Sequence, residues 1–210
     1  MKKSKFIVFE GIDGSGKTNA CKIITKILNA HNIKYIHVRE PGGTKLSEHI
    51  RKIIKYNYKN EKVHRKTILL LIYAARMQLI ENVIKPSLEN NIWVLSDRYY
   101  LSSFAYQGGG FQIKNELLVF LQKNIVDLII PDITFYLDVK PKIAIERIHK
   151  RNLVDALEHE NLDFFTRTRN AYLNLIKKDS QIITINANVK INLVHQEIQY
   201  KFQKWLKTCT

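Results

Sequence analysis

Residues 6–18 read FIVFEGIDGSGKT and decide the fold of this chain. The stretch opens with four apolar residues of β-branched and aromatic types, which are typical of a buried strand. The remainder matches the pattern G-x-x-x-x-G-K-[ST] without a mismatch, through Gly11, Gly16, Lys17 and Thr18. Backbone N–H groups of such a loop can surround phosphate oxygens only where side chains stay clear, and glycines meet this requirement. The stretch therefore predicts a strand followed by a phosphate-binding loop.

The two residues that close the loop predict what it binds. Lys17 would reach the β- and γ-phosphates of a nucleotide, and the hydroxyl of Thr18 would bind Mg²⁺. Behind the loop, apolar residues recur at i, i+3, i+4, i+7 and i+8 over residues 20–28, which predicts an amphipathic helix. The N-terminus of this helix would face the phosphates. A glycine-rich turn that matches by chance is the alternative, and the strand before the loop and the helix after it argue against that alternative.

The composition is that of one globular domain spanning residues 1–210. Hydrophobic residues make up 45% of the chain, which is enough to build a full core. The two cysteines, Cys21 and Cys209, are too few for a disulfide framework and favour the cytoplasm. We expect no membrane partner, because no apolar run approaches a membrane span and no signal peptide precedes the first strand.

The net charge of +15 could indicate a nucleic-acid partner. The lysines, however, are scattered along the chain, and no long basic run gathers them. Diffuse solvated charge together with a small anionic substrate is therefore the favoured interpretation, and a nucleic-acid groove is the less favoured one.

Strand and helix patterns alternate along the chain. Apolar runs predict strands at residues 6–9, 35–38, 92–95, 132–138 and 181–186. Helical periodicity predicts helices at about 20–28, 45–54, 66–86, 143–150, 165–176 and 191–205, and a helical turn at 101–106 closed by Gln107 and three glycines. The alternation predicts a three-layer α/β fold with five parallel strands between helices. Ligands of such sheets bind beyond the carboxyl ends of the strands.

Charged residues follow three of these strand ends, at Asp13, Arg39, Glu40, Asp97 and Arg98. Asp97 occupies the place where a P-loop enzyme holds Mg²⁺ through an acid, usually by way of water. Arg98 beside it can grip a phosphate bidentately. For both residues, the alternative is an exposed ion pair at a strand end.

Spacing alone leaves three further side chains open. Arg76 lies in the most apolar part of a helix, where a buried arginine is expensive unless it is paired. An arginine that reaches solvent fits the same pattern equally well. Arg51 alone fits a solvated helix residue, and Glu40 alone fits a loop carboxylate.

Six motifs together resemble the bacterial thymidylate kinases, in the same order and at comparable spacing. They are FEGIDGSGKT, REPGGT, YAAR, DRYYLSSFAYQGGG, PDITFYLDV and DFFTRTRNAYL. The resemblance covers nearly the whole chain. It implies the P-loop nucleoside monophosphate kinase fold, with a short lid near residues 149–162 and a homodimeric assembly. The implied reaction is ATP + dTMP → ADP + dTDP with Mg²⁺, a step in dTTP synthesis.

The resemblance also implies roles around the phosphates. Asp13 would accept a hydrogen bond from the sugar 3′-hydroxyl, Arg51 and Arg98 would hold the acceptor phosphate, and Glu40 would lie near the metal and the phosphates. The implied ATP-binding residues are Gly11, Ile12, Asp13, Gly14, Ser15, Gly16, Lys17 and Thr18. The implied catalytic residues are Lys17, Asp97, Arg98 and Arg151, with Thr18 and Asp97 at the metal.

Further roles implied by the resemblance concern the acceptor base. Arg76 would hydrogen-bond the thymine, Ser103 and Gln107 would contact the base edge, and Tyr106 would crowd the sugar 2′-position. A helix cap remains an alternative for Ser103, and a core aromatic remains one for Tyr106. Ile72 departs from the family, which usually has a phenylalanine there that stacks on thymine.

The lid is a second departure. The loop has no arginine after Asp13, which resembles the subgroup that carries its catalytic arginine in the lid. The lid position at which that subgroup ends its arginine run is Ala156 here. The catalytic charge would then fall to Arg151, Lys150 or Arg147, and Arg151 is the preferred candidate.

Two other functions stay open at this stage. One is a kinase for a different pyrimidine nucleotide. The other is a P-loop ATPase or switch protein that uses its basic charge on nucleic acid. The sequence contains no N-K-x-D motif for reading guanine, and it has neither a basic stripe nor an aromatic platform for nucleic acid.

Overall fold

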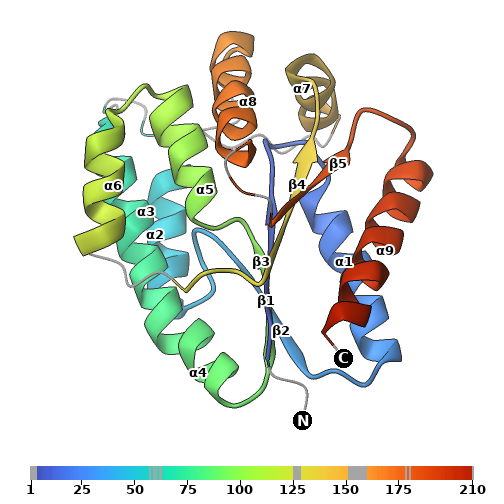
Figure 1. The fold of residues 1–210 in the computed structure, drawn as a ribbon. Coiled ribbons are helices and arrows are strands. Elements are labelled where there is room, and N and C mark those ends of the chain that lie inside the picture. Colours follow the sequence, from blue (N-terminus) through green and yellow to red (C-terminus); the bar gives the residue numbers. More distant parts are fainter. Residues whose placement is uncertain are drawn as a thin grey trace.

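A computed structural model of the chain describes residues 4–56, 58, 61, 63–124, 129–150, 160–177, 179 and 181–209. Within these residues, a parallel sheet lies between two layers of helices (Figure 1). Its strand order is β2-β3-β1-β4-β5. The strands are β1 (Phe6–Glu10), β2 (Tyr35–Arg39), β3 (Trp93–Asp97), β4 (Ile133–Asp138) and β5 (Ile182–Asn186). The expected three-layer α/β fold is confirmed.

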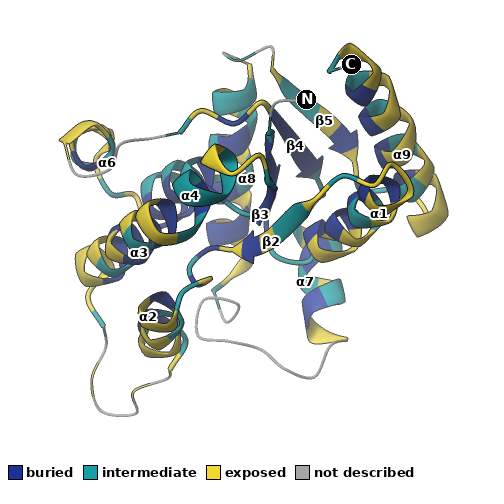
Figure 2. Ribbon diagram, turned by 90° about the horizontal axis from the view of Figure 1, so that it is seen from below, coloured by how far each residue is buried: buried dark blue, intermediate teal, exposed yellow. Residues whose placement is uncertain are grey.

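The register of the sheet brings the strand ends of interest together. Asp97 pairs with Phe9 on one side and with Arg39 on the other, so β1, β3 and β2 end at the same edge. The central strands are buried almost throughout, whereas β2 and β5 at the sheet edges are partly exposed (Figure 2). A strand covered on both faces reads as a continuous apolar run, which is why residues 6–9 were recognisable.

The helices cover both faces of the sheet. On one face, α1 (Lys17–Ala30) packs against α9 (Ile191–Thr208). The opposite layer contains α2 (Lys45–Lys55), α3 (Arg65–Leu79), α4 (Lys85–Glu89), α5 (Tyr100–Ser103) and α6 (Asn115–Asn124). The helices α7 (Pro141–His149) and α8 (Leu162–Ile176) stand beyond the carboxyl ends of the strands (Figure 1). The Thr44 side chain caps α2 by accepting a hydrogen bond from the Ser47 backbone at 3.0 Å, as is common for threonine at this position.

The longest helix corrects one expectation. A π-helical segment, η1 (Ile80–Ile84), joins α3 to α4, so the helix passes Pro86 and ends only at Glu89. By length and composition alone, the stretch Arg65–Glu89 could cross a membrane, contrary to the expectation that no apolar run approaches that size. Half of its most apolar window is buried within the fold, where Leu69 and Leu79 pack in the core. The buried side of this helix is thus part of the core.

The sequence predicts that the three glycines at residues 108–110 close a helical turn, and this prediction is wrong. They continue α5 as a second π-helical segment, η2 (Phe104–Gly110), which packs against α8. A Cβ on Gly109 would lie 2.5 Å from the Cβ of Ala171, and one on Gly110 would lie 2.5 Å from the Phe164 ring. The glycines therefore allow a close helix–helix approach, and their turn propensity is overridden.

The remaining expected strands and helices are present, with ends shifted by a few residues. The helix α6 is not predicted by the sequence pattern, because its ten residues bury only Leu118 and Leu121 while Val119 and Phe120 between them are exposed. Such a helix has no continuous apolar stripe to recognise. Most of the expected lid, residues 151–159, lies outside the described residues.

Candidate active site

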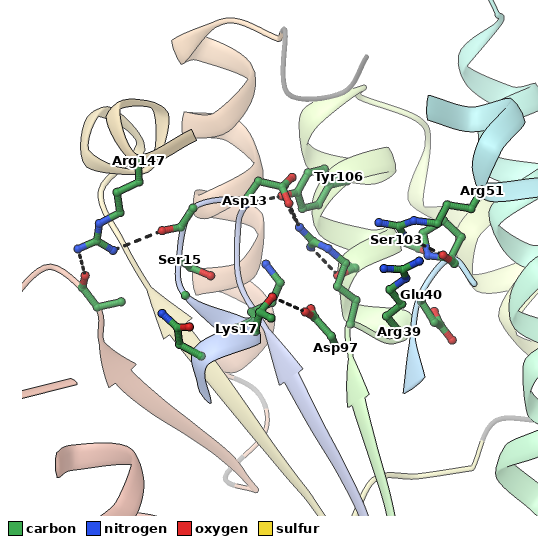
Figure 3. A pocket seen from close by; sticks show the side chains of 18 of the residues that line it. Asp13, Ser15, Lys17, Arg39, Glu40, Arg51, Asp97, Ser103, Tyr106 and Arg147 are labelled. Carbon is green, nitrogen blue, oxygen red and sulfur yellow. Dashed lines mark hydrogen bonds and ion pairs between the residues drawn. The ribbon is translucent and has the colours of Figure 1, made fainter. Parts of the chain in front are cut away.

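A cavity of about 610 Å³ opens at the edge where the strands end. It runs from the phosphate-binding loop across the ends of β2 and β3 to α2 and α3 on one side, and to α7 and α9 on the other. Figure 3 shows its charged side chains converging from several elements. The position agrees with the general rule for parallel sheets flanked by helices.

The phosphate-binding loop has the conformation that its glycines permit. Gly14 has a φ of +77°, and a Cβ there would lie 2.5 Å from the carbonyl oxygen of Ala144. The Lys17 ammonium is buried and donates hydrogen bonds to the carbonyl oxygens of Gly11 and Ile12 at 3.0 and 3.2 Å. Burial, together with nearby Arg98, lowers the pKa of Lys17. The carbonyl groups of the loop thus fix the position of the Lys17 ammonium.

Thr18 and Asp97 meet beside the loop. The Thr18 hydroxyl donates a hydrogen bond of 3.3 Å to the Asp97 carboxylate. A hydroxyl and a carboxylate are oxygen donors of the kind that Mg²⁺ takes, with water and phosphate oxygens completing its shell. No group of three or more His, Cys, Asp or Glu side chains forms a metal cage within the described ranges. The pair therefore fits a magnesium ion carried in with nucleotide phosphates.

Arg98 joins the phosphate-binding loop to the rest of the cavity. Its guanidinium contacts the Asp13 carboxylate at 2.6 Å and the Tyr106 hydroxyl at 2.9 Å. It also lies over the Tyr106 ring, 4.6 Å from the centroid. The Tyr106 hydroxyl donates to the second oxygen of Asp13 at 2.8 Å, so the three side chains contact one another pairwise; Figure 3 shows Asp13 and Tyr106 side by side. These three residues form one network, so Tyr106 is more than a core aromatic.

The charges of this network support each other. Burial alone would raise the pKa of Asp13, but Arg98 and Lys17 hold it well below its ordinary value. Asp13 is therefore ionised at neutral pH.

The backbone of Arg98 has a φ of +77°, a left-handed conformation that is uncommon for residues other than glycine and costs on the order of 1–3 kcal/mol. Such strain persists where surrounding contacts fix a functional side chain.

Arg76 is buried and paired. Its side chain is 1% exposed and contacts the Glu40 carboxylate at 2.7 Å, the Ser103 hydroxyl at 3.0 Å and the Tyr99 carbonyl oxygen at 3.2 Å. The other oxygen of Glu40, Oε1, is buried and has no hydrogen-bond partner within the described part of the chain. Burial raises the pKa of Glu40, and Arg76 opposes this effect. Of the two interpretations of Arg76, the buried one is correct, and its partner is Glu40.

The other expected acceptor-site residues line the same half of the cavity. Arg51 donates a hydrogen bond to the Pro41 carbonyl oxygen at 2.8 Å. Ile72 presents an apolar side chain, and Ser103 and Gln107 are buried polar residues at the wall. The Ser103 hydroxyl accepts a hydrogen bond from Arg76 at the cavity wall and does not cap a helix. Together these residues make a pocket with one apolar wall and several polar groups, a composition that suits an aromatic base.

The opposite end of the cavity is largely apolar. Arg147 of α7 donates hydrogen bonds to the carbonyl oxygens of Gly14 and Ala187 at 3.3 and 3.0 Å (Figure 3). His195 of α9 lies at this end, and its Nε2 is buried with no hydrogen-bond partner among the described residues. The remaining lining at this end comes from Ala187, Ile191, Val194 and Ile198.

Comparison with known proteins identifies the family. A family model described as thymidylate kinase matches residues 9–198. The chain belongs to the thymidylate kinase family. It is 50% identical over 208 residues to the thymidylate kinase of Buchnera aphidicola subsp. Schizaphis graminum, covering 99% of this chain and 98% of that protein. It is also 45% identical to that of Wigglesworthia glossinidia brevipalpis over 231 residues, and 44% identical to that of Vibrio vulnificus strain YJ016 over 208 residues. The alignment with the Wigglesworthia protein covers 99% of both proteins, and the alignment with the Vibrio protein covers 99% of this chain and 98% of that protein.

This thymidylate kinase family member places most of its expected site residues in one cavity. Gly11 and Ile12 do not line it, because the Ile12 side chain is in the core and the two residues contribute their carbonyl oxygens to Lys17. Arg151 and Ala156 lie outside the described residues.

Sequence reasoning missed several residues that line the cavity. Arg39 and Lys55 line the cavity at the acceptor end, and His195 lines it at the other end. The position of Arg39 after a strand predicts a charge at the sheet edge but no specific role. His195 left no signal, since a histidine on a terminal amphipathic helix has the pattern of a surface residue.

Proposed function

We propose that this member of the thymidylate kinase family transfers the γ-phosphoryl group of ATP to dTMP and so forms ADP and dTDP. The observation that carries the proposal is the continuity of the cavity. One hollow joins the phosphate-binding loop to a second pocket lined by Arg98, Arg51 and Arg76. Two anionic substrates can thus bind next to each other in one cavity, and positioning is the main task in phosphoryl transfer.

The donor triphosphate would lie on the loop. Lys17 would contact the β- and γ-phosphates and exchange its carbonyl contacts for phosphate oxygens. Thr18 and Asp97 would hold Mg²⁺, which neutralises charge on the phosphates when bound. Arg147, beside Gly14, and the apolar lining formed by α9 would receive the donor base.

The acceptor would enter from the side of α2 and α3. Arg98 and Arg51 would hold its phosphate, and Asp13 would accept a hydrogen bond from its 3′-hydroxyl. Tyr106 would crowd the 2′-position. Because the Asp13–Arg98 pair joins the two halves, the acceptor phosphate would be held next to the transferring group.

The acceptor base would lie deeper in the same half of the cavity. Ile72 would pack against the thymine, and Ser103 and Gln107 would contact its edge. Arg76 would hydrogen-bond the base, and the Glu40 carboxylate would neutralise the charge of Arg76. Arg151 remains the proposed lid cation, because the family's usual position is Ala156 here.

We also propose a cytoplasmic location, which the low number of cysteines favours.

We further propose that the protein forms a homodimer. Leu70 and Met77 lie two helical turns apart on α3 and are 54% and 43% exposed, and Leu46 and Ile53 are exposed on the adjacent α2. An apolar face of this kind is suited to a second copy of the chain. Light scattering on the protein and on a Leu70→Arg variant would measure the expected shift from dimer to monomer.

The test of the reaction is ADP release measured with ATP alone, with ATP and each of a panel of pyrimidine and purine monophosphates, and with ATP and DNA. We expect release to require a monophosphate and to be fastest with dTMP. A strong preference for another monophosphate would assign a different acceptor. Stimulation by DNA but not by dTMP would contradict the proposal.

A further inference from the structure

Glu10 is a buried carboxylate next to the site that the proposed reaction does not use. It ends β1, directly before the phosphate-binding loop, and its side chain has no exposed surface. It is not part of the cavity lining. Its Oε1 accepts backbone N–H groups of Tyr99 and Ser102 at 2.9 and 3.2 Å, and its Oε2 accepts the hydroxyls of Ser102 and Tyr172 at 2.6 and 2.7 Å. Both oxygens are therefore fully engaged.

The partners of Glu10 are also the partners of Arg98. The Ser102 hydroxyl accepts a hydrogen bond from Nη1 of Arg98 at 3.0 Å, and the Tyr172 hydroxyl lies 3.5 Å from the same nitrogen. The two hydroxyls lie 2.8 Å from each other. A chain of contacts thus runs from a buried carboxyl group through two hydroxyls to the guanidinium.

The backbone contact reinforces this arrangement. Tyr99, whose N–H binds Glu10, directly follows Arg98, the residue with the strained φ of +77°. On the other side, the Arg98 N–H donates to the Phe9 carbonyl oxygen at 2.9 Å. The last two residues of β1 therefore accept hydrogen bonds from the backbone N–H groups of Arg98 and of Tyr99, which follows it.

We propose that Glu10 is a positioning residue that holds Arg98 in the orientation required to bind the acceptor phosphate. It acts through Ser102, Tyr172 and the Tyr99 backbone, and it contacts no substrate itself. A preorganised guanidinium loses less free energy on binding phosphate than one that must first be ordered. The pKa of Glu10 is raised by its burial, and the hydrogen bond from Ser102 and the charge of Arg98 oppose this effect.

The inference rests on the proposed function, in which Arg98 holds the acceptor phosphate. The competing explanation is that Glu10 only satisfies buried donors and so contributes to stability alone. The two explanations differ in kinetics. A purely stabilising residue affects the melting temperature and the active fraction, while a positioning residue changes the KM of one substrate.

The decisive variant is Glu10→Gln, which keeps the shape but replaces an acceptor oxygen with an amide donor. The amide has a single acceptor oxygen, so it cannot accept from the two hydroxyls and from the two backbone N–H groups at once, and Arg98 should lose its orientation. We expect the KM for dTMP to rise on the order of tenfold, with the KM for ATP changed by less than about twofold. A lower melting temperature with both KM values unchanged would overturn the proposal.

Ser102→Ala provides a second variant and a double-mutant cycle. If Glu10 acts through the Ser102 hydroxyl, this variant should also raise the KM for dTMP, and the double variant should be scarcely worse than either single one. Additive effects would contradict the coupling. Should Glu10→Gln fail to fold, an unchanged KM for dTMP in Ser102→Ala would overturn the proposal by itself.

Asp132→Asn is the matched control. Asp132 accepts the backbone N–H of Phe6 at 2.8 Å at the opposite end of β1, far from the cavity. This change should lower the melting temperature without altering either KM. A wild-type protein that does not saturate with dTMP would refute the proposed function itself, which is a separate outcome from any effect of Glu10→Gln.

Discussion

The two halves of the cavity are built on different physical principles. The acceptor half contains buried ionic groups that are already paired, including Arg98 with Asp13 and Arg76 with Glu40. The donor-base end consists mainly of aliphatic side chains, with Arg147 and His195 as its polar members. Buried charges need compensating partners, so the acceptor half must be assembled before substrate binds. Apolar surface has no such requirement, and substitutions there should have smaller effects.

Lys17 lies between the two halves, and its loss should have the largest effect. Replacing Lys17 by alanine removes the charge next to the transferring phosphoryl group, so kcat should fall by on the order of 10³-fold or more. Circular dichroism should show an unchanged fold. Wild-type turnover in this variant would mean that the loop does not carry the donor phosphates.

Glu40→Ala tests whether the acceptor half depends on ionic pairing. The change leaves the Arg76 guanidinium buried without its counter-ion, which should cost about 3–5 kcal/mol in the free energy of unfolding. Denaturant titration measures this quantity. The control is Glu81→Ala, which breaks the exposed pair with Lys85 and should cost at most about 1 kcal/mol. Equal losses in the two variants would mean that burial of the first pair carries no special cost.

Arg98→Ala should separate the two substrates. A charge-assisted hydrogen bond to the acceptor phosphate contributes about 1.5–3 kcal/mol, so the KM for dTMP should rise by roughly 10- to 100-fold. The KM for ATP should change much less. If both KM values rise together, Arg98 does not belong to the acceptor half alone.

Ile72→Phe should sharpen the comparison by adding a favourable contact. Ile72 offers apolar area but no π-face, and aromatic stacking adds on the order of 0.5–1.5 kcal/mol beyond burial. We expect dTMP to bind up to about tenfold more tightly, as measured by calorimetry. Weaker binding would indicate that neighbouring side chains already fill the space above the base.

His195→Leu should have the smallest effect of the series. Nε2 of His195, which has no hydrogen-bond partner among the described residues, can make a hydrogen bond to a donor base, and losing one such bond costs about 0.5–1.5 kcal/mol. The KM for ATP should rise a few-fold while the KM for dTMP stays constant. Gln196→Leu, on an exposed neighbouring position of α9, is the control. A large rise in the KM for dTMP would show that the two ends of the cavity are not independent.

Much of this architecture could be predicted from the sequence, because its signals are local. The glycine spacing of the phosphate-binding loop and the apolar strand runs identified the fold, and the motifs together identified the family. The polar partnerships were less accessible. Spacing left Arg76 open, since its partner Glu40 lies on a different element and 36 residues away. The contacts of Glu10 could not be predicted for the same reason, because its partners Tyr99, Ser102 and Tyr172 lie far from it in the sequence.

Local propensity also misled the analysis where tertiary packing overrides it. The glycines at 108–110 have the composition of a turn, yet their contact with α8 keeps them helical. Likewise, the stretch through Pro86 continues as a helix because a π-helical segment precedes the proline. Neither result follows from a single sequence without knowledge of what the segment packs against.

The two ends of the described chain lie at the base of the sheet, on the side away from the cavity (Figure 1). A tag, a fluorescent protein or a surface linker attached at either end would therefore point away from the substrates. Protein immobilised in this way presents its open face to solution. Its affinity for dTMP should match that of the free enzyme, which makes sensor chips and single-molecule tethers practical for this protein.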